Sequence, residues 1–231
     1  MNPQNLALRV QSVRERIARA CAESGRSAQS VTLLAVSKGQ SVQLMGAAAD
    51  LGVSSFGESY LNEALGKIAA LRERDLEWHF IGRIQANKTR PVAESFAWVH
   101  AVDRLKIAER LSAQRPFHAP PLNVCLQVNL AGEASKGGVA PGELAALAHA
   151  VAALPRLKLR GLMCLPPQES SPQRQRHWFH ALAALFHELN AGGARLDTLS
   201  MGMSDDFEAA IAEGSTLVRL GTVLFGPRSV Q

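Results

Sequence analysis

Short runs rich in apolar and β-branched residues alternate along the chain with longer segments whose apolar residues recur every three or four positions. Eight of the short runs have the length and composition of strands, and we predict them at Val31–Ser37, Gly52–Phe56, Trp78–Ile81, Ala97–Ala101, Asn123–Asn129, Leu159–Met163, Thr198–Ser200 and Leu217–Leu220. We predict helices between them at Ser41–Leu51, Ser59–Glu73, Lys88–Glu94, Arg104–Ala113, Pro141–Leu154, Gln173–Asn190 and Ser204–Glu213. This alternation indicates repeated βα units around a parallel sheet.

The number of strands decides between two parallel architectures. Eight strands favour closure, so the predicted fold class is α/β, a single (β/α)8 TIM-type barrel. An open, doubly wound sheet is the alternative, but Ser37–Ser41 after the first strand has one glycine and lacks the dinucleotide fingerprint. An extra helix from about Asn5 to Glu23 presents an apolar face for packing outside the barrel. We expect one domain over residues 1–231.

Composition and charge narrow the class of protein. Cys21, Cys125 and Cys164 are far apart and fit no metal-ligand spacing, so we expect reduced thiols and no metal site. No apolar span could cross a bilayer and the N-terminus is not of signal-peptide type, which predicts a cytoplasmic protein with no membrane partner. The formal charge of +5 is scattered rather than clustered, so we expect no nucleic-acid partner. Without a second, dimerising domain we expect a monomer.

Lys38 is the first candidate for chemistry, because it ends the apolar run that begins at Val31. In barrels of this class the site lies at the carboxyl ends of the strands, where this side chain should lie. A lysine at a strand end is commonly a solvated cap. A partly desolvated lysine has a lowered pKa, however, and its free amine can attack an aldehyde to form an imine.

Loops after the last two predicted strands have the residue types of a phosphate site. Ser204 precedes an acidic helix start and is a plausible N-cap, while Gly202 and Gly221 allow close approach of the backbone to an anion. The same residues also suit a capped helix and two turns without any ligand. Arg219 lies in an apolar strand and needs an acceptor, which is either a carboxylate at the barrel mouth or a ligand. His79 is either a hydrogen-bonded core residue or lies below the ligand.

The motifs taken together resemble a known family. They are Leu34-Ala35-Val36-Ser37-Lys38, Phe56-Gly57-Glu58, Trp78-His79-Phe80-Ile81-Gly82 with Gln85 and Asn87-Lys88, Gln127-Val128-Asn129, Ser135-Lys136-Gly137-Gly138, Arg160-Gly161-Leu162-Met163, Leu199-Ser200-Met201-Gly202-Met203-Ser204-Asp205-Asp206 and Val218-Arg219-Leu220-Gly221-Thr222. From about Val31 to Arg228 the chain is similar to the pyridoxal phosphate homeostasis protein family, whose members are single barrels of the type that forms the cofactor domain of alanine racemase.

The resemblance implies a set of roles. Lys38 would form an imine with pyridoxal 5′-phosphate (PLP), Ser204, Gly221 and Thr222 would hold its phosphate, and Arg219 would approach its pyridine nitrogen. The remaining cofactor-binding candidates from these motifs are Ser59, Asn87, Met163, Ser200 and Gly202. No residue is assigned a catalytic role.

The chain departs from the family pattern at two places. Ser59 stands where the family commonly has asparagine, so we expect this shorter hydroxyl to reach the cofactor only through water. After Lys38 the family often has threonine, lysine and proline, whereas this chain has Gly39-Gln40-Ser41, which predicts a looser loop.

These roles favour cofactor handling over catalysis. An arginine donates hydrogen bonds only, so it would leave the pyridine nitrogen unprotonated and make the ring a poor electron sink. We therefore predict a PLP-binding protein that buffers the cofactor or delivers it through transient contact with PLP-dependent apoenzymes. One alternative is an amino-acid racemase that uses Lys38 and Tyr60 as opposed bases. A second alternative is a Schiff-base aldolase that needs no cofactor.

Overall fold

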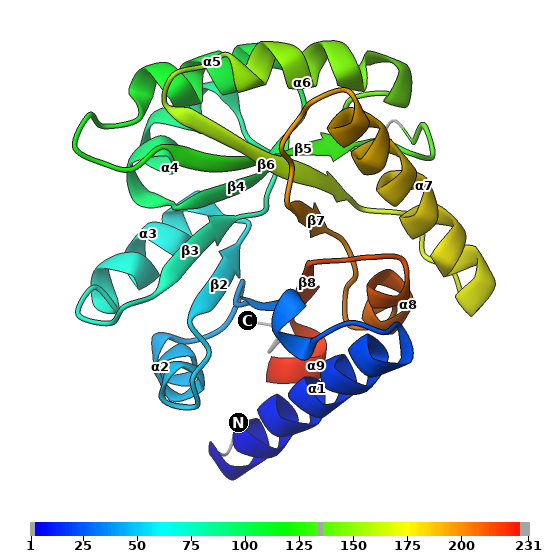
Figure 1. Ribbon diagram of the computed structural model, residues 1–231. Helices are drawn as coiled ribbons and strands as arrows, with labels where there is room; N and C mark the ends of the chain where they lie inside the picture. Colours follow the sequence, from blue (N-terminus) through cyan, green and yellow to red (C-terminus); the bar gives the residue numbers. More distant parts are fainter. Residues whose placement is uncertain (1–2, 134–135, 227–231) are drawn as a thin grey trace.

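The computed structural model describes residues 3–133 and 136–226, which form a closed barrel of parallel strands surrounded by helices (Figure 1). The strands follow one another in chain order around the barrel and are β1 (Thr32–Val36), β2 (Ser55–Glu58), β3 (Glu77–Phe80), β4 (Trp98–Val102), β5 (Leu122–Val128), β6 (Leu157–Cys164), β7 (Thr198–Ser200) and β8 (Leu217–Leu220). Because β1 pairs in parallel with both β2 and β8, the sheet has no edge strand. The predicted (β/α)8 barrel is confirmed, and the open sheet is wrong.

The helices cover the outside of the barrel. They are α1 (Pro3–Glu23), α2 (Val42–Asp50), α3 (Leu61–Ala70), α4 (Thr89–Ser95), α5 (Leu105–Gln114), α6 (Leu144–Ala152), α7 (Pro172–Ala191), α8 (Phe207–Ala212) and α9 (Thr222–Phe225). The described residues also form three short 3-10 turns, η1 (Ala28–Ser30), η2 (Ala86–Lys88) and η3 (Pro141–Glu143). The extra N-terminal helix is confirmed as α1, which buries Leu6, Val10 and Val13 and lies beside α8 and α9 (Figure 1).

Most of the predicted boundaries are shifted by one to three residues. The second strand begins at Ser55 rather than Gly52, because Gly52 has a φ of +78° and turns the chain after α2. The helix predicted at Ser204–Glu213 begins at Phe207 instead, so the predicted N-cap role of Ser204 is wrong. Ser135 and Arg228, named in the family resemblance, lie outside the described residues. None of the described helices is both long and apolar enough to span a membrane.

The three cysteines are buried, free thiols, which leads to a first prediction. Burial raises the pKa of Cys125 and of Cys164 to about 12, and it also raises the pKa of Cys21. Because the thiolate is the nucleophile, the native protein should not react with a thiol reagent at pH 8, and all three thiols should react after unfolding. Colorimetric thiol titration with and without denaturant measures this difference, and rapid labelling of even one native thiol would contradict it.

Candidate functional site

A cavity of about 250 Å³ opens at the carboxyl ends of the strands. Its wall includes six of the residues that the sequence proposed for ligand binding, namely Lys38, Ser59, Ser204, Arg219, Gly221 and Thr222. They come from the loops after β1, β2 and β7 and from β8 and its following turn. Residues from the two ends of the chain thus meet in one cavity, as expected of a barrel closed by β1 and β8.

The backbone on both sides of Lys38 is anchored by the second strand and the third helix. The Ser37 N–H donates to the Gly57 carbonyl at 3.0 Å, and the Ser37 hydroxyl donates to Glu58 Oε1 at 2.7 Å. On the other side the Gly39 N–H donates to Glu63 Oε1 at 2.6 Å. Lys38 itself is half-buried at the cavity wall. These bonds fix where its side chain starts, so the predicted loose loop is held at its first turn.

A second lysine, Lys67 of α3, hydrogen-bonds to three of the residues that anchor the backbone around Lys38. Its ammonium donates to the Ser37 carbonyl at 2.6 Å, to Glu58 at 2.7 Å and to Glu63 at 2.5 Å. Lys67 is 5% exposed and Glu58 is fully buried. Burial raises the pKa of Glu58, and the hydrogen bonds from Lys67 and Ser37 oppose that rise. This cluster was not predicted from the sequence, in which its local signal is the i, i+4 spacing of Glu63 and Lys67 on one helix.

Arg219 of β8 lies on the inner wall of the cavity and is buried. Its Nη1 donates to the Ser200 carbonyl at 2.5 Å and to the Ser200 hydroxyl at 2.9 Å, while its Nη2 donates to the Cys164 carbonyl at 2.8 Å. Within the described residues it forms no ion pair with a carboxylate. The carboxylate partner considered for Arg219 is therefore not found there, and neutral oxygens receive its hydrogen bonds.

The loops after β7 and β8 meet at the start of α9. The Ser204 hydroxyl accepts the Val223 N–H at 3.3 Å and lies 3.4 Å from the Thr222 hydroxyl, so Ser204 serves α9 rather than α8. Asp206 takes the position before α8, and its carboxylate accepts the Met203 N–H at 2.6 Å. A Cβ on Gly221 would lie 3.3 Å from the Val36 carbonyl, so a side chain would crowd β1. Hydroxyls and backbone N–H groups at this corner suit an anionic group.

Four other candidates do not line the cavity. Ser200 and Met163 are buried within the barrel, and Met163 packs with Trp98 and its neighbours. Gly202 acts through its carbonyl, which accepts the Arg219 N–H at 2.9 Å. Asn87 is exposed on η2. Ser200 and Gly202 hydrogen-bond to Arg219, which does line the cavity.

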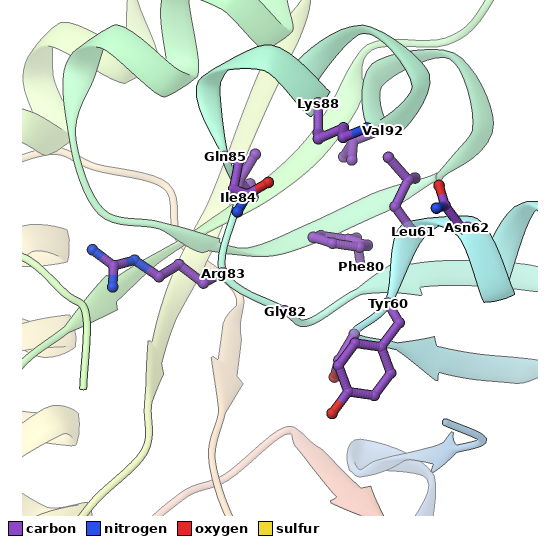
Figure 2. Close-up of a pocket in the computed structure, with 11 residues that line it drawn as sticks. Tyr60, Leu61, Asn62, Phe80, Gly82, Arg83, Ile84, Gln85, Lys88 and Val92 are labelled. Carbon is purple, nitrogen blue, oxygen red and sulfur yellow. The ribbon is translucent and has the colours of Figure 1, made fainter. Parts of the chain in front are cut away.

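A larger cavity of about 510 Å³ lies beside the first one and shares Ser59 with it. Tyr60 lines this second cavity, is 59% exposed, and lies at the opposite end of the group from Lys88 (Figure 2). Tyr60 is absent from the wall that carries Lys38. In the described parts of the chain, no three side chains of histidine, cysteine, aspartate or glutamate gather as a metal site would need.

Two buried histidines, His79 and His100, are linked to Arg219 by hydrogen bonds through Ser200. Their burial leads to a prediction of how the stability of the protein depends on pH. Burial lowers the pKa of His79 and lowers that of His100 further, with nearby His79 and Arg219 adding to the effect. Because both pKa values are lowered, the folded protein binds these protons at a lower pH than the unfolded chain, which binds them below about pH 6.5. Stability should therefore be full above that pH and fall as the pH decreases, by up to about 2.7 kcal/mol per unit for two groups.

Urea unfolding between pH 7 and pH 5 measures this slope. His100→Gln removes one imidazole and should reduce the slope by up to about 1.4 kcal/mol per pH unit, while carboxylates common to both proteins cancel in the difference. Equal slopes for the two proteins would contradict the lowered pKa of His100 in the folded state.

Known proteins are similar to this chain over almost its whole length. Residues 9–229 match the family model described as alanine racemase, N-terminal domain. A protein of Pseudomonas aeruginosa named pyridoxal phosphate homeostasis protein is 56% identical over 223 residues, which cover 96% of each chain. The chain belongs to the pyridoxal phosphate homeostasis protein family. The family member of Escherichia coli strain K12 is 49% identical over 227 residues, 97% of each chain.

Solved structures give the same family and a wider fold group. PipY of Synechococcus elongatus, solved with PLP bound, is 35% identical with a TM-score of 0.85, covering 96% of this chain and 100% of its own. Alanine racemase of Corynebacterium glutamicum is 16% identical with a TM-score of 0.66, over 95% of this chain and 62% of the racemase chain. This chain thus shares only the barrel fold with the racemase, whereas it is similar to the homeostasis proteins in sequence as well.

Proposed function

We propose that this protein binds PLP as an imine of Lys38 and contributes to PLP homeostasis by buffering or delivering the cofactor, without amino-acid turnover. The observation that carries the proposal is that Lys38, Arg219 and the Ser204–Thr222 corner line one cavity. The relatives named pyridoxal phosphate homeostasis protein and the PLP-bound PipY support the choice of ligand.

The residues of the cavity fit three polar groups of PLP, namely the phosphate, the aldehyde and the pyridine nitrogen. The phosphate suits the corner where the Ser204 and Thr222 hydroxyls and the start of α9 meet and Gly221 permits close approach. Lys38 on the first strand's loop and Arg219 on the eighth strand supply the amine and the guanidinium from adjacent strands. When bound, PLP supplies an aldehyde that condenses with the Lys38 amine: the C=N bond forms and the carbonyl oxygen leaves as water.

Arg219 argues against strong catalysis. Its guanidinium only donates hydrogen bonds, and its buried charge disfavours a second positive charge beside it. The ring nitrogen next to it would stay unprotonated, which weakens the electron withdrawal that decarboxylation and transamination need. Tyr60, the second base of the racemase alternative, lies in the neighbouring cavity. These two positions favour a carrier over a racemase.

A turnover assay separates the carrier from the racemase. Protein loaded with PLP is incubated with single enantiomers of alanine and other amino acids, and the enantiomers are separated by chiral chromatography. We expect no product beyond one equivalent per protein. Sustained racemisation that is lost in Tyr60→Phe would establish the racemase instead. A protein that stays colourless when PLP is added would point to the aldolase.

Direct delivery would require contact with an acceptor enzyme, and we propose that a monomer in the cytoplasm makes this contact. The loaded protein and a PLP-dependent apoenzyme are placed either in one compartment or on two sides of a dialysis membrane. Faster recovery of enzyme activity in the shared compartment is the expected result. Equal rates would leave buffering of free PLP as the function. Sedimentation should give one species near 24.8 kDa, and a dimer would contradict the proposed monomer.

A further inference from the structure

A chain of buried polar side chains crosses the barrel behind the candidate site. Arg219 Nη1 lies 2.9 Å from the Ser200 hydroxyl, which lies 2.8 Å from His100 Nδ1. The other ring nitrogen of His100, Nε2, lies 2.9 Å from His79 Nδ1. The chain ends where His79 Nε2 lies 3.0 Å from Glu77 Oε1. Four of the five residues are buried, and the Glu77 side chain is 46% exposed. Glu77 begins β3, so the chain joins the cavity to the opposite end of the barrel.

The two ends fix the direction of every hydrogen bond between them. Arginine has no acceptor, so the Ser200 oxygen accepts from Arg219 and its own proton is available for His100 Nδ1. His100 then carries its proton on Nε2 and donates to His79 Nδ1, and His79 donates from Nε2 to the Glu77 carboxylate. The reverse direction would place an unprotonated His79 Nε2 against a carboxylate oxygen, with two acceptors 3.0 Å apart. One arrangement of neutral rings therefore satisfies the whole chain.

Neighbouring groups hold the His79 end of the chain. The His79 ring stacks on Trp98 with centroids 5.4 Å apart and planes 7° apart. The Arg160 guanidinium lies 4.6 Å from the Trp98 ring centre and pairs with Asp197, so its charge is compensated outside the chain. Packing thus sets the plane of the His79 ring. The Glu77 carboxylate determines which ring nitrogen of His79 carries the proton.

We propose that Glu77, His79, His100 and Ser200 are positioning residues that hold the Arg219 guanidinium in the orientation needed at the cofactor's ring nitrogen. This inference rests on the proposed binding of PLP. Arg219 is a buried cation without a carboxylate partner among the described residues, so oriented neutral dipoles supply its stabilisation. A Ser200 hydroxyl that pointed its proton at Arg219 would repel it. Glu77 prevents this from the far end of the barrel.

The proton positions can be measured without any cofactor. In two-dimensional ¹⁵N–¹H spectra of the ¹⁵N-labelled protein at pH 7, both His79 and His100 should be neutral with the proton on Nε2. Assignment follows from His79→Phe and His100→Phe. A His100 ring protonated at Nδ1 would reverse the chain and overturn the inference.

Two substitutions of His100 separate the halves of the chain. In His100→Asn the side-chain oxygen lies as many bonds from Cβ as Nδ1 and still accepts from Ser200. In His100→Gln the amide group reaches only as far as Nε2 and serves His79 instead. We expect Asn to keep the PLP dissociation constant within about threefold of wild type, and Gln to weaken binding about tenfold, as for one hydrogen bond to a charged group.

Ser200→Ala gives a second test, because it removes the hydroxyl and changes little side-chain volume. We expect it to weaken PLP binding about tenfold and to shift the pH dependence of the visible absorbance. Circular dichroism checks that each variant is folded. If wild type binds PLP and all three variants bind it equally with unchanged spectra, the positioning role is wrong and the proposed function stands. If wild type itself fails to bind PLP, the proposed function falls and takes this role with it.

Discussion

Lys38→Ala should abolish the visible imine absorbance of the PLP-loaded protein and leave weaker, non-covalent binding. The C=N bond needs the Lys38 amine, whereas Ser204, Thr222 and Arg219 remain in place to hold the phosphate and the ring. We expect the dissociation constant for PLP to rise about a hundredfold, which corresponds to roughly 3 kcal/mol. An absorbance titration before and after borohydride reduction measures both effects.

Two companion variants show what the loss means. Lys38→Arg keeps the charge but cannot form the imine, so it should also lack the visible band. Lys88→Ala removes an exposed lysine that does not line this cavity, and it should behave like wild type. An unchanged band in Lys38→Ala, or loss of the band in Lys88→Ala, would place the imine elsewhere.

Lys67→Met should destabilise the protein by about 3–5 kcal/mol at pH 7, because it removes one partner of a buried ion pair. Glu58 would be left fully buried without its cation, and the Ser37 carbonyl beside Lys38 would lose its donor. Burial already raises the pKa of Glu58, and without Lys67 less opposes that rise. The folded variant would then bind a proton that the unfolded chain releases above about pH 4.5, so its stability should fall as the pH rises.

Urea unfolding of a double-mutant cycle measures this effect. Glu58→Gln in the Lys67→Met background removes the unpaired charge, and it should recover more than half of the lost stability. Arg90→Ala breaks an exposed pair on α4 and should change stability by less than about 1 kcal/mol. A loss below about 1 kcal/mol in Lys67→Met would mean that the buried pair contributes no more than a surface pair.

The fold was predictable because its signals are local. Alternating strand and helix patterns follow from neighbouring residues, and eight repeats imply closure. Lys38 and Arg219 could be proposed because each is a charged residue at or near the end of an apolar run. Whether Arg219 had a carboxylate partner could not be decided from sequence, because its acceptors on β6 and β7 are distant in the chain.

Other parts of the site depend on contacts that sequence spacing does not encode. Lys67 reads as an ordinary helical lysine, since its partners Glu58 and Ser37 belong to β2 and to the loop after β1. Ser204 was misassigned because Ser204-Asp205-Asp206 offers three successive capping residues, and the structure places the third before α8. The link between His79 and His100 needs the alignment of two neighbouring strands.

Identification of the modified lysine tests the central claim most directly. The protein is loaded with PLP, reduced with borohydride to make the bond permanent, digested, and analysed by tandem mass spectrometry. We predict one phosphopyridoxyl group, on Lys38, and its absence from the same peptide of Lys38→Arg. A stoichiometric adduct on another lysine, such as Lys136 or Lys88, with Lys38 unmodified would contradict the account.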